Sequence, residues 1–349
     1  MADPATCAPL TRQSVIDAHE IIKPLVHHTP VVTSTFLNQL ASTPRKNAKP
    51  VLRLWFKCEN QQRVGAFKVR GAFHAIERLK QEPGWIEGGG QSRGVVGFSA
   101  GNHAQAVALA ARESKMPAHI VMPETSSPVK IKSVEGYGAK LTISGRFDRE
   151  AVAARIVEET GARLLPPYDH PDVILGQGTV GLEMQGQIPK LDAIISPSSG
   201  GGLLSGTALS CEGTGIRVYG AEPEFEGADD GRRGFLSGKR ITHVASNTIA
   251  DGLVGKLGAY PWEVIYERRL VDMLYAVSEE EILDAMKLIF ERLKLVVEPA
   301  AAVPLAVALY NEEFREMVER TAGEAGWDVG IILSGGNVGI ERIAELFSR

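Results

Sequence analysis

The sequence predicts an α/β fold in which helices cover both faces of parallel sheets. Short apolar runs, rich in valine and isoleucine, alternate along the chain with segments of helical length and helical periodicity. This alternation is typical of βαβ units, whose strands pair in parallel and are buried on both faces. Glycine-rich or polar turns join several of the apolar runs to the next helix. With 349 residues, the chain is long enough for about two domains.

In the first half of the chain, each predicted strand is followed by a predicted helix. Residues 94–98 (GVVGF) form a short buried strand, and the runs that follow it have the same apolar character. The helix after the third of these strands places Ala151, Ala154 and Ile156 among its apolar positions. The strands are expected at residues 94–98, 119–122 and 141–143, and the helices at residues 104–113, 128–136 and 149–160.

The same alternation resumes after Pro166 and Pro167. Residues 278–281 (SEEE) form a capping box, and the helix that follows places Ile282, Met286, Ile289 and Leu293 on one face. Residues 42–49 and the glycine-rich stretch 88–93 are expected to be surface loops. Strands are predicted at residues 193–195, 218–221 and 329–333, and helices at residues 173–187, 203–209 and 340–347.

Composition and charge exclude several classes of protein. The chain has 38 lysine and arginine residues against 42 aspartate and glutamate residues, a net charge of −4, and no basic run, so nucleic acid is not an expected partner. It lacks an apolar run of the roughly 18 residues that a membrane helix needs. Three widely spaced cysteines cannot form a disulfide framework. Because the first ten residues do not resemble a signal peptide, we expect a cytoplasmic enzyme.

Three strand-to-helix junctions carry possible chemistry, and the first is residues 196–204 (SPSSGGGLL). Ligands of open parallel sheets collect at such junctions. Consecutive glycines allow several backbone N–H groups to face one point at a helix start, which suits a phosphate group without any lysine. A tight turn that only packs a helix against a strand is the simpler alternative, but it would explain one or two glycines rather than three.

The second junction is residues 99–103 (SAGNH), which allow two functional interpretations. Its backbone amides and Asn102 could bind a substrate carboxylate. Residues 97–101 also match the G-x-S-x-G nucleophile elbow of α/β-hydrolases, with Ser99 as the nucleophile and histidines downstream as candidate bases. Asn102 or Ser99 could also be a helix cap without any further role.

The third junction, residues 65–72 (GAFKVRGA), contains Lys68 in an otherwise apolar stretch. Desolvation lowers the pKa of a lysine and makes its amine nucleophilic toward an aldehyde. A lysine on the exposed face of an amphipathic helix is the commoner situation, so the neighbouring junctions are needed to favour the reactive interpretation.

Together these segments resemble the fold-type II pyridoxal-phosphate enzymes, specifically the threonine/serine dehydratase and serine racemase family. The resemblance extends from about residue 28 to residue 337, and its matching segments occur in order. They are residues 57–59 (KCE), 65–72 (GAFKVRGA), 99–105 (SAGNHAQ), 169–179 (DHPDVILGQGT), 200–203 (GGGL), 220–223 (GAEP), 248–252 (TIADG), 297–299 (VEP) and 334–337 (SGGN).

The resemblance implies two open, twisted, mostly parallel sheets, in a large domain (residues 1–90 and 170–349) and a small mobile domain (residues 91–169). It also implies pyridoxal 5′-phosphate as the cofactor, bound covalently by Lys68. The residues that it assigns to the cofactor site are Phe67, Asn102, Ser199, Gly200, Gly201, Gly202, Leu203, Glu298 and Ser334, with Asn102 at the phenolic oxygen, residues 200–203 at the phosphate and Ser334 at the ring nitrogen. It assigns Ser99, Ala100, Asn102, His103, Arg149 and Gly252 to a small amino-acid substrate.

Members of the racemase branch bind a divalent cation after the strand that ends in Ala-Glu-Pro. Glu222, Ala228 and Asp230 are the corresponding candidates here for Mg²⁺ or a similar ion, although the loop between them is two residues longer than in the family. The resemblance also implies a homodimer.

The resemblance further implies β-elimination, in which a 3-hydroxy amino acid such as L-threonine or L-serine gives a 2-oxo acid and ammonia. A serine at the ring nitrogen stabilises less positive charge on the ring than an aspartate would. The ring then withdraws electrons more weakly, which favours loss of a β-hydroxyl group. Racemases carry a second base, a serine, at the position of Ala100, and alanine cannot accept a proton. The alternatives left open are a racemase, a dehydratase for 3-hydroxyaspartate or a bulkier substrate, the α/β-hydrolase, and a cofactor-binding protein without catalytic activity.

Overall fold

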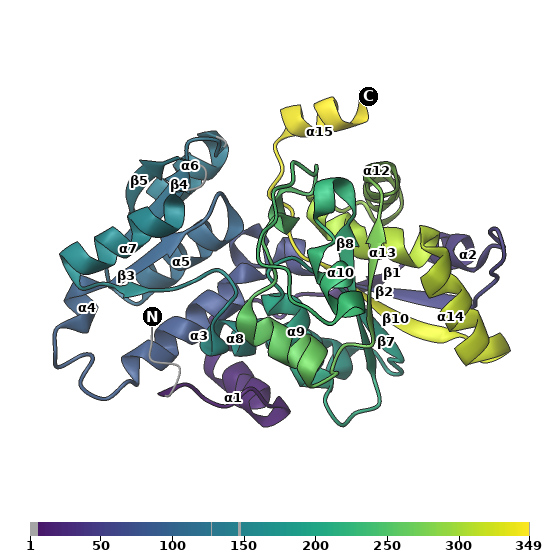
Figure 1. Cartoon of the computed structure of the whole chain (residues 1–349), viewed down its shortest axis with the longest axis horizontal. Helices are drawn as coiled ribbons and strands as arrows, with labels where there is room; N and C mark the ends of the chain where they lie inside the picture. The colour runs from purple at the N-terminus through teal and green to yellow at the C-terminus, as the bar shows by residue number, and fades with distance from the viewer. Residues whose placement is uncertain (1–5, 127, 146–147, 349) are drawn as a thin grey trace.

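The computed structural model describes residues 6–126, 128–145 and 148–348 and contains two sheets with helices on both faces. The larger sheet has the strand order β1-β2-β10-β7-β8-β9, and the smaller sheet has the order β5-β4-β3-β6. All pairs are parallel except β1 with β2, at one edge of the larger sheet. This arrangement confirms the predicted fold class, and Figure 1 shows the small sheet beside the large one.

The strands of the larger sheet are β1 (Val31–Thr33), β2 (Leu52–Cys58), β7 (Ala193–Pro197), β8 (Arg217–Pro223), β9 (Met273–Val277) and β10 (Trp327–Leu333), and those of the smaller sheet are β3 (Val95–Phe98), β4 (Ala118–Pro123), β5 (Lys140–Ser144) and β6 (Arg163–Leu164). The helices are α1 (Arg12–Ile22), α2 (Thr35–Ser42), α3 (Lys68–Lys80), α4 (Gly90–Arg93), α5 (Asn102–Glu113), α6 (Pro128–Gly136), α7 (Arg149–Thr160), α8 (Pro171–Gln187), α9 (Gly202–Cys211), α10 (Asp230–Ser237), α11 (Ala259–Trp262), α12 (Glu279–Leu288), α13 (Pro299–Tyr310), α14 (Glu312–Ala322) and α15 (Ile340–Phe347).

The register of the larger sheet brings several chain segments to one edge. Strand β10 lies between β2 and β7, and Leu333 at its end pairs with Cys58 at the end of β2. Strand β7 pairs with β8 up to Pro197 and Ala221. Because the carboxyl ends of parallel strands lie on the same side of a sheet, the loops after β7, β8 and β10 lie together there. This is the expected place for a ligand site in an open α/β sheet.

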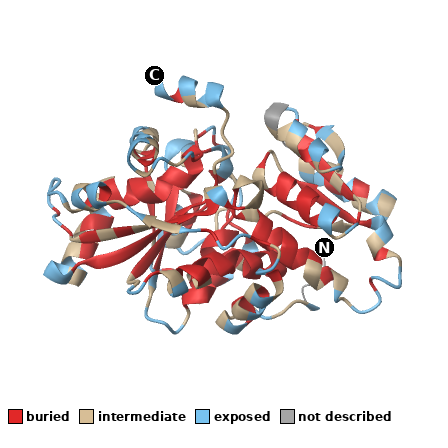
Figure 2. Cartoon of the chain, turned by 180° about the vertical axis from the view of Figure 1, so that it is seen from behind, coloured by how far each residue is buried: buried red, intermediate tan, exposed pale blue. Residues whose placement is uncertain are grey.

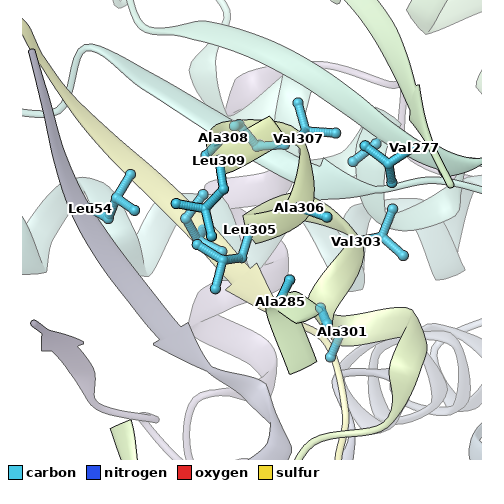
Figure 3. Packing of buried hydrophobic residues seen from close by; sticks show 14 of the residues in the cluster. Leu54, Val277, Ala285, Ala301, Val303, Leu305, Ala306, Val307, Ala308 and Leu309 are labelled. Carbon is cyan, nitrogen blue, oxygen red and sulfur yellow. The ribbon is translucent and has the colours of Figure 1, made fainter. Parts of the chain in front are cut away.

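Most residues of the strands and of the helices packed on them are buried (Figure 2). Helix α13 is buried from Pro299 to Leu309, and a helix that is apolar all round belongs inside a core. Figure 3 shows its side chains in a cluster that also contains Leu54, Val277 and Ala285. This packing fixes the start of α13, and therefore the position of the preceding Glu298.

A second core cluster joins the smaller sheet to helix α3. Phe73 and Ile76 of α3 share this cluster with Val95, Val107 and Ile120 of the predicted small domain. The predicted domain division therefore crosses a continuous apolar contact, in which α3 packs against α5. Lys68 begins α3, so the helix that carries this lysine packs both against α5 of the predicted small domain and against α8 of the predicted large domain.

The structure confirms the predicted strands and helices, with ends that differ by a few residues. The capping box at Ser278 forms, and Ile282, Met286 and Ile289 are buried, whereas Leu293 is half-buried in a π-helical turn. The prediction of a surface loop over residues 88–93 is wrong in its second part. Residues 90–93 form one helical turn, because Gly90 lies against the Trp85 ring, where a Cβ would come within 2.4 Å. Within the described ranges, no helix has the length and apolar character needed to cross a membrane.

Candidate active site

One pocket brings together every residue that the resemblance assigned to the cofactor and the substrate. Its lining comes from the loops after β3, β7 and β10, from the starts of α3, α5 and α9, and from α6 and α7, so both sheets contribute. The assigned residues that line it are Phe67, Lys68, Ser99, Ala100, Asn102, His103, Arg149, Ser199, Gly200, Gly201, Gly202, Leu203, Gly252, Glu298 and Ser334. Lys130, Tyr168 and Asp251 also line it, and the sequence did not single them out.

Lys68 is held at the start of α3 with its amine facing the pocket. Its Nζ donates a hydrogen bond to the carbonyl oxygen of Pro167 at 2.7 Å and lies 5.1 Å from the centre of the Phe67 ring. Burial lowers the pKa of Lys68 to about 8, although the carboxyl group of Glu298 acts in the opposite direction. The predicted desolvation is therefore confirmed, and a substantial fraction of the amine is neutral and nucleophilic near neutral pH.

The glycine loop before α9 forms a cradle of backbone amides. Gly201 has a φ of +85°, a left-handed conformation that favours glycine, and α9 begins at the next residue. A Cβ on Gly200 would lie 2.3 Å from the Tyr168 ring, so the loop leaves no room for a side chain there. The first N–H groups of a helix have no partner within the helix, and this end of α9 is therefore suited to a phosphate group.

Ser199 connects the glycine loop to a second segment of the pocket through its hydroxyl group. Its hydroxyl donates to the carbonyl oxygen of Gly255 at 2.8 Å and accepts from the Gly255 N–H at 2.7 Å. Both bonds tie the glycine loop to residues 252–255, which line the opposite side of the pocket. The hydroxyl of Ser199 thus holds two walls of the pocket together.

Asn102 and Glu298 form a buried polar pair beside Lys68. The Asn102 Nδ2 donates to Glu298 Oε1 at 2.8 Å, and Glu298 is almost fully buried. Burial, with a further effect of the nearby Asp251 carboxylate, raises the pKa of Glu298 to about 7. Glu298 therefore exchanges a proton near neutral pH, close to the amine of Lys68.

The loop at residues 99–103 is suited to bind a carboxylate. It runs from the end of β3 into the N-terminus of α5, where unpaired amides and the helix dipole favour an anion. His103 donates from Nε2 to the carbonyl oxygen of Leu165 at 2.9 Å, and burial lowers the pKa of His103 to about 3. The imidazole is therefore neutral at physiological pH.

The α/β-hydrolase interpretation requires a base beside Ser99. The hydroxyl oxygen of Ser99 accepts a hydrogen bond from the Gly101 N–H at 3.2 Å. Among the described residues, no histidine hydrogen-bonds to Ser99, and the ring of His103 is directed to Leu165 instead. The pairing of nucleophile and base that a hydrolase needs is not formed.

Two positively charged side chains line the pocket, and they differ in whether they form an ion pair. Lys130 of α6 pairs with Asp251 at 2.9 Å, which links the smaller sheet's helices to the larger domain. Arg149, at the start of α7, forms no ion pair within the part of the chain that the structure describes. A half-buried guanidinium group in a pocket is a binding group for an anionic part of a ligand.

The pocket fits pyridoxal phosphate on structural grounds. The amide cradle suits the phosphate, and Lys68 supplies a desolvated amine for the aldehyde. The Ser334 hydroxyl, at the end of β10, has no hydrogen-bond partner among the described residues, so it is free to face a ring nitrogen. One N–H of Asn102 remains after its bond to Glu298 and can reach a phenolic oxygen.

The candidate cation residues lie outside this pocket, between the end of β8 and the start of α10. Glu222 and Asp230 are both fully buried, and each has one carboxylate oxygen, Oε1 and Oδ1, without a hydrogen-bond partner. Burial raises the pKa of Glu222 well above its usual value, and the charge of Asp230 adds to the effect. Burial also raises the pKa of Asp230 to about 6. Two unpaired buried carboxylates fit a hard divalent cation, which would remove both desolvation costs.

Cys7, His170 and Asp172 form a second cluster with metal-ligand chemistry, which the sequence did not indicate. The backbone N–H of Asp172 donates to His170 Nδ1 at 3.2 Å, so a neutral His170 carries its proton on Nε2, the atom that faces the Cys7 thiol. Burial raises the pKa of the Cys7 thiol to about 12. The Cys7 thiol also donates to Asp172 Oδ2 at 3.4 Å, and these contacts attach the N-terminal segment to α8.

A lysine that faces an amide cradle, in a pocket between two open α/β sheets, defines the class of fold-type II pyridoxal-phosphate enzymes. A family model described as "Pyridoxal-phosphate dependent enzyme" matches residues 22–335, and the chain belongs to this family. Its relatives place it in the threonine/serine dehydratase and serine racemase group, whose cofactor is pyridoxal phosphate.

Three of these relatives cover almost the whole chain. The L-threo-3-hydroxyaspartate ammonia-lyase of Saccharomyces cerevisiae is 43% identical over 343 residues, which is 97% of this chain and 96% of that protein. A serine racemase of Oryza sativa subsp. indica is 43% identical over 93% of this chain and 90% of its own. The structure of maize serine racemase superposes with a TM-score of 0.85 and 42% identity, and covers 97% of both chains.

Proposed function

We propose that this protein is an ammonia-lyase that removes the β-hydroxyl group and the amino group of an L-3-hydroxy amino acid, giving a 2-oxo acid and ammonia. The cofactor, when bound, supplies the electron withdrawal that makes the Cα proton acidic. Lys68 is proposed to remove that proton, since its amine faces the pocket and burial lowers its pKa to about 8. The amides of residues 99–103 are proposed to hold the substrate carboxylate.

Ala100 is the observation that supports elimination over racemisation. It lines the same pocket as Lys68, and its methyl group can neither accept nor donate a proton. His103 and Tyr168, which line the same pocket, are poor bases near neutral pH. The pKa of His103 is lowered to about 3, so its imidazole binds a proton weakly, and burial raises the pKa of Tyr168 to about 12, so its hydroxyl group stays protonated. Racemisation needs a second proton carrier on the opposite face of the substrate, whereas elimination needs only one base.

A screen of 3-hydroxy amino acids tests this proposal directly. The purified holoenzyme is incubated with L-threonine, L-serine and both diastereomers of 3-hydroxyaspartate, and release of 2-oxo acid and ammonia is measured beside the Lys68→Ala variant. Oxo acid should form from at least one substrate and be almost lost in the variant. No release from any substrate contradicts the lyase, and racemisation that outpaces elimination selects the racemase.

For the identity of the substrate, the structure offers a reason to prefer 3-hydroxyaspartate to threonine or serine. The loop at residues 99–103 accounts for one carboxylate, and Arg149 remains as a cation without an ion pair among the described residues. A second carboxylate on the substrate would pair with the positive charge of Arg149. A hydrogen bond to a charged group contributes about 1.5–3 kcal/mol. The 43% identity to a yeast protein named for L-threo-3-hydroxyaspartate supports the same choice.

Arg149→Gln measures this preference, and Arg155→Gln is its matched control. Arg155 lies on the same helix, is exposed and pairs only with Glu159. The Arg149 variant should lower kcat/KM for 3-hydroxyaspartate by about 10- to 100-fold, and lower that for threonine much less. Equal losses for both substrates would contradict a specific role in binding the second carboxylate.

Three further expectations from the sequence remain proposals. Glu222, Asp230 and the carbonyl group of Ala228 are proposed to bind Mg²⁺ or another divalent cation, which the two unpartnered carboxylate oxygens support. A homodimer and a cytoplasmic location follow only from the family resemblance and the composition. Sedimentation of the purified protein and microscopy of a tagged chain would test them.

A further inference from the structure

Asn337 connects two parts of the active site that are far apart in the sequence. Its Nδ2 donates one hydrogen bond to the carbonyl oxygen of Val64 at 2.7 Å and another to Asn102 Oδ1 at 2.9 Å. Both hydrogens of the amide are therefore used. Val64 lies four residues before Lys68, and Asn102 lies in the loop after β3 of the other sheet.

The Val64 partner lies in a strained turn. Val64 has a φ of 55° and a ψ of 13°, a left-handed conformation that a β-branched residue seldom adopts, and Gly65 follows with a φ of 69°. Such residues persist only where the surrounding structure holds them, and they gather at functional sites. The turn leads directly into Ala66, Phe67 and Lys68.

The chain that carries Asn337 fastens this turn with two further backbone hydrogen bonds. The Gly336 N–H donates to the Gly65 carbonyl oxygen at 2.9 Å, and the Phe67 N–H donates to the Ser334 carbonyl oxygen at 3.1 Å. These two bonds form the antiparallel bridge between Ala66 and Gly335. A Cβ on Gly65 would lie 2.8 Å from Asn337 Oδ1, so the contact requires a glycine. Asn337 adds a side-chain bond at the most strained residue.

The other partner, Asn102, has its amide orientation fixed from both ends. Asn337 donates to its oxygen, and its nitrogen donates to Glu298 Oε1 at 2.8 Å. An acceptor on one side and a donor on the other leave only one orientation of the Asn102 amide. Its remaining N–H is the group that the family resemblance assigns to the phenolic oxygen of the cofactor, which the proposed function requires.

We propose that Asn337 is a positioning residue that sets the Asn102 amide and the Lys68 turn relative to each other, so that both meet the cofactor at once. The proposal rests on the role of Asn102 in the proposed function. Asn337 does not touch the cofactor pocket and acts through its two partners. Without it, the strained turn loses a bond and the Asn102 amide loses the donor that orients it.

The test uses the holoenzyme without substrate, so that its outcome is separate from the outcome of the lyase assay. Asn337→Ala should weaken binding of pyridoxal phosphate by about 10- to 100-fold, the usual loss when a supporting hydrogen bond is removed. It should also change the ratio of the long- and short-wavelength absorption bands of the bound cofactor, since that ratio reports the hydrogen bond at the phenolic oxygen. Asn337→Asp keeps the shape of the side chain but replaces the donating NH2 group by an oxygen that faces the Val64 carbonyl oxygen and Asn102 Oδ1. This variant should give the same change in the band ratio.

Asn60→Ala is the matched control, because among the described residues the Asn60 side chain donates to the Val296 carbonyl oxygen and forms no hydrogen bond with Asn102 or Lys68. It should leave the band ratio and the cofactor affinity unchanged. Val64→Gly relieves the strain, and combined with Asn337→Ala it should recover part of the affinity but not the band ratio. The proposal is wrong if Asn337→Ala and Asn337→Asp keep the band ratio of the wild type, or if Val64→Gly restores it.

Discussion

Two ionisable side chains with oppositely shifted pKa values meet in the pocket. Burial lowers the pKa of Lys68 to about 8 and raises that of Glu298 to about 7, and each reduces the shift of the other through its charge. Their pKa values are close to each other and near neutral pH. Groups with pKa values shifted towards neutral are typical of functional sites, and both side chains can change their protonation state near neutral pH.

Capture of the cofactor by the apoprotein should therefore depend on pH. Only the neutral amine of Lys68 attacks an aldehyde, and its fraction rises as the pH increases through about 8. The rate of pyridoxal phosphate incorporation, followed by absorbance, should increase from pH 6.5 to pH 8.5 by about 25-fold, as the Henderson–Hasselbalch relation gives for a group with a pKa of about 8. A rate that is flat over this range would show that the amine is not the limiting group.

At the same scale, Ala100 separates the lyase from a racemase. Ala100→Ser places a hydroxyl group in the pocket, at the position where the family resemblance places the second base of racemases. The variant should increase conversion of L-serine to D-serine by about tenfold or more, within the usual contribution of a positioned acid or base. Chiral chromatography measures this conversion, and Ser99→Ala in the same loop shows whether any hydroxyl group there has the same effect. Unchanged racemisation in Ala100→Ser would remove the argument from Ala100.

Among the elements, the turn before α9 shows how backbone shape builds a ligand site. Two of its three glycines are needed for different reasons. Gly201 has a left-handed backbone conformation, and a Cβ on Gly200 would collide with the Tyr168 ring. Gly200→Ala should displace the loop from the ring and lower the affinity for pyridoxal phosphate by about 10- to 100-fold, as overpacking costs about 1–3 kcal/mol. Gly186→Ala in α8 is a control for fold stability, because a Cβ there meets nothing within 4 Å and the residue does not have a positive φ. Cofactor affinity, measured by fluorescence, should not change in that control.

The sequence predicted these elements well where local chemistry determines the structure. The glycine loop, the capping box at Ser278 and the desolvated Lys68 each follow from residues that are neighbours in the chain. Contacts between distant segments could not be predicted in this way. The pairing of Lys130 with Asp251, the bonds of Asn337 and the use of Ser199 to join two loops depend on how the two sheets pack.

The residues 88–93 illustrate the same limit. A run of three glycines indicates a flexible connection, yet Gly90 is buried because the Trp85 ring packs against its Cα. The signal for this contact was the tryptophan five residues earlier, whose partner no local pattern identifies. Here tertiary packing overrides the usual meaning of glycine.

On the scale of the whole molecule, the candidate cation residues between the end of β8 and the start of α10 should make the stability of the fold depend on pH and on a bound cation. Glu222 and Asp230 are buried with one unpartnered oxygen each, and both pKa values are raised above those of an unfolded chain. A carboxyl group with a raised pKa in the folded state stabilises the fold below its unfolded pKa, and this stability is lost as the pH rises through the folded pKa. For Asp230 that window runs from about pH 4 to about pH 6.

Mg²⁺ should therefore stabilise the folded protein at pH 8 and much less at pH 5. At pH 8 the carboxylate of Asp230 is available to the ion, and an ion at one hundred times its Kd adds about 2.7 kcal/mol to the free energy of unfolding. At pH 5 protons compete for the same oxygens, so the increase in Tm on adding Mg²⁺ should shrink. Thermal unfolding with and without Mg²⁺ at the two pH values measures this. Asp230→Asn should abolish the increase, whereas Asp229→Asn, next to it but paired with the exposed Arg233, should retain it. An equal increase in both variants would place the ion elsewhere.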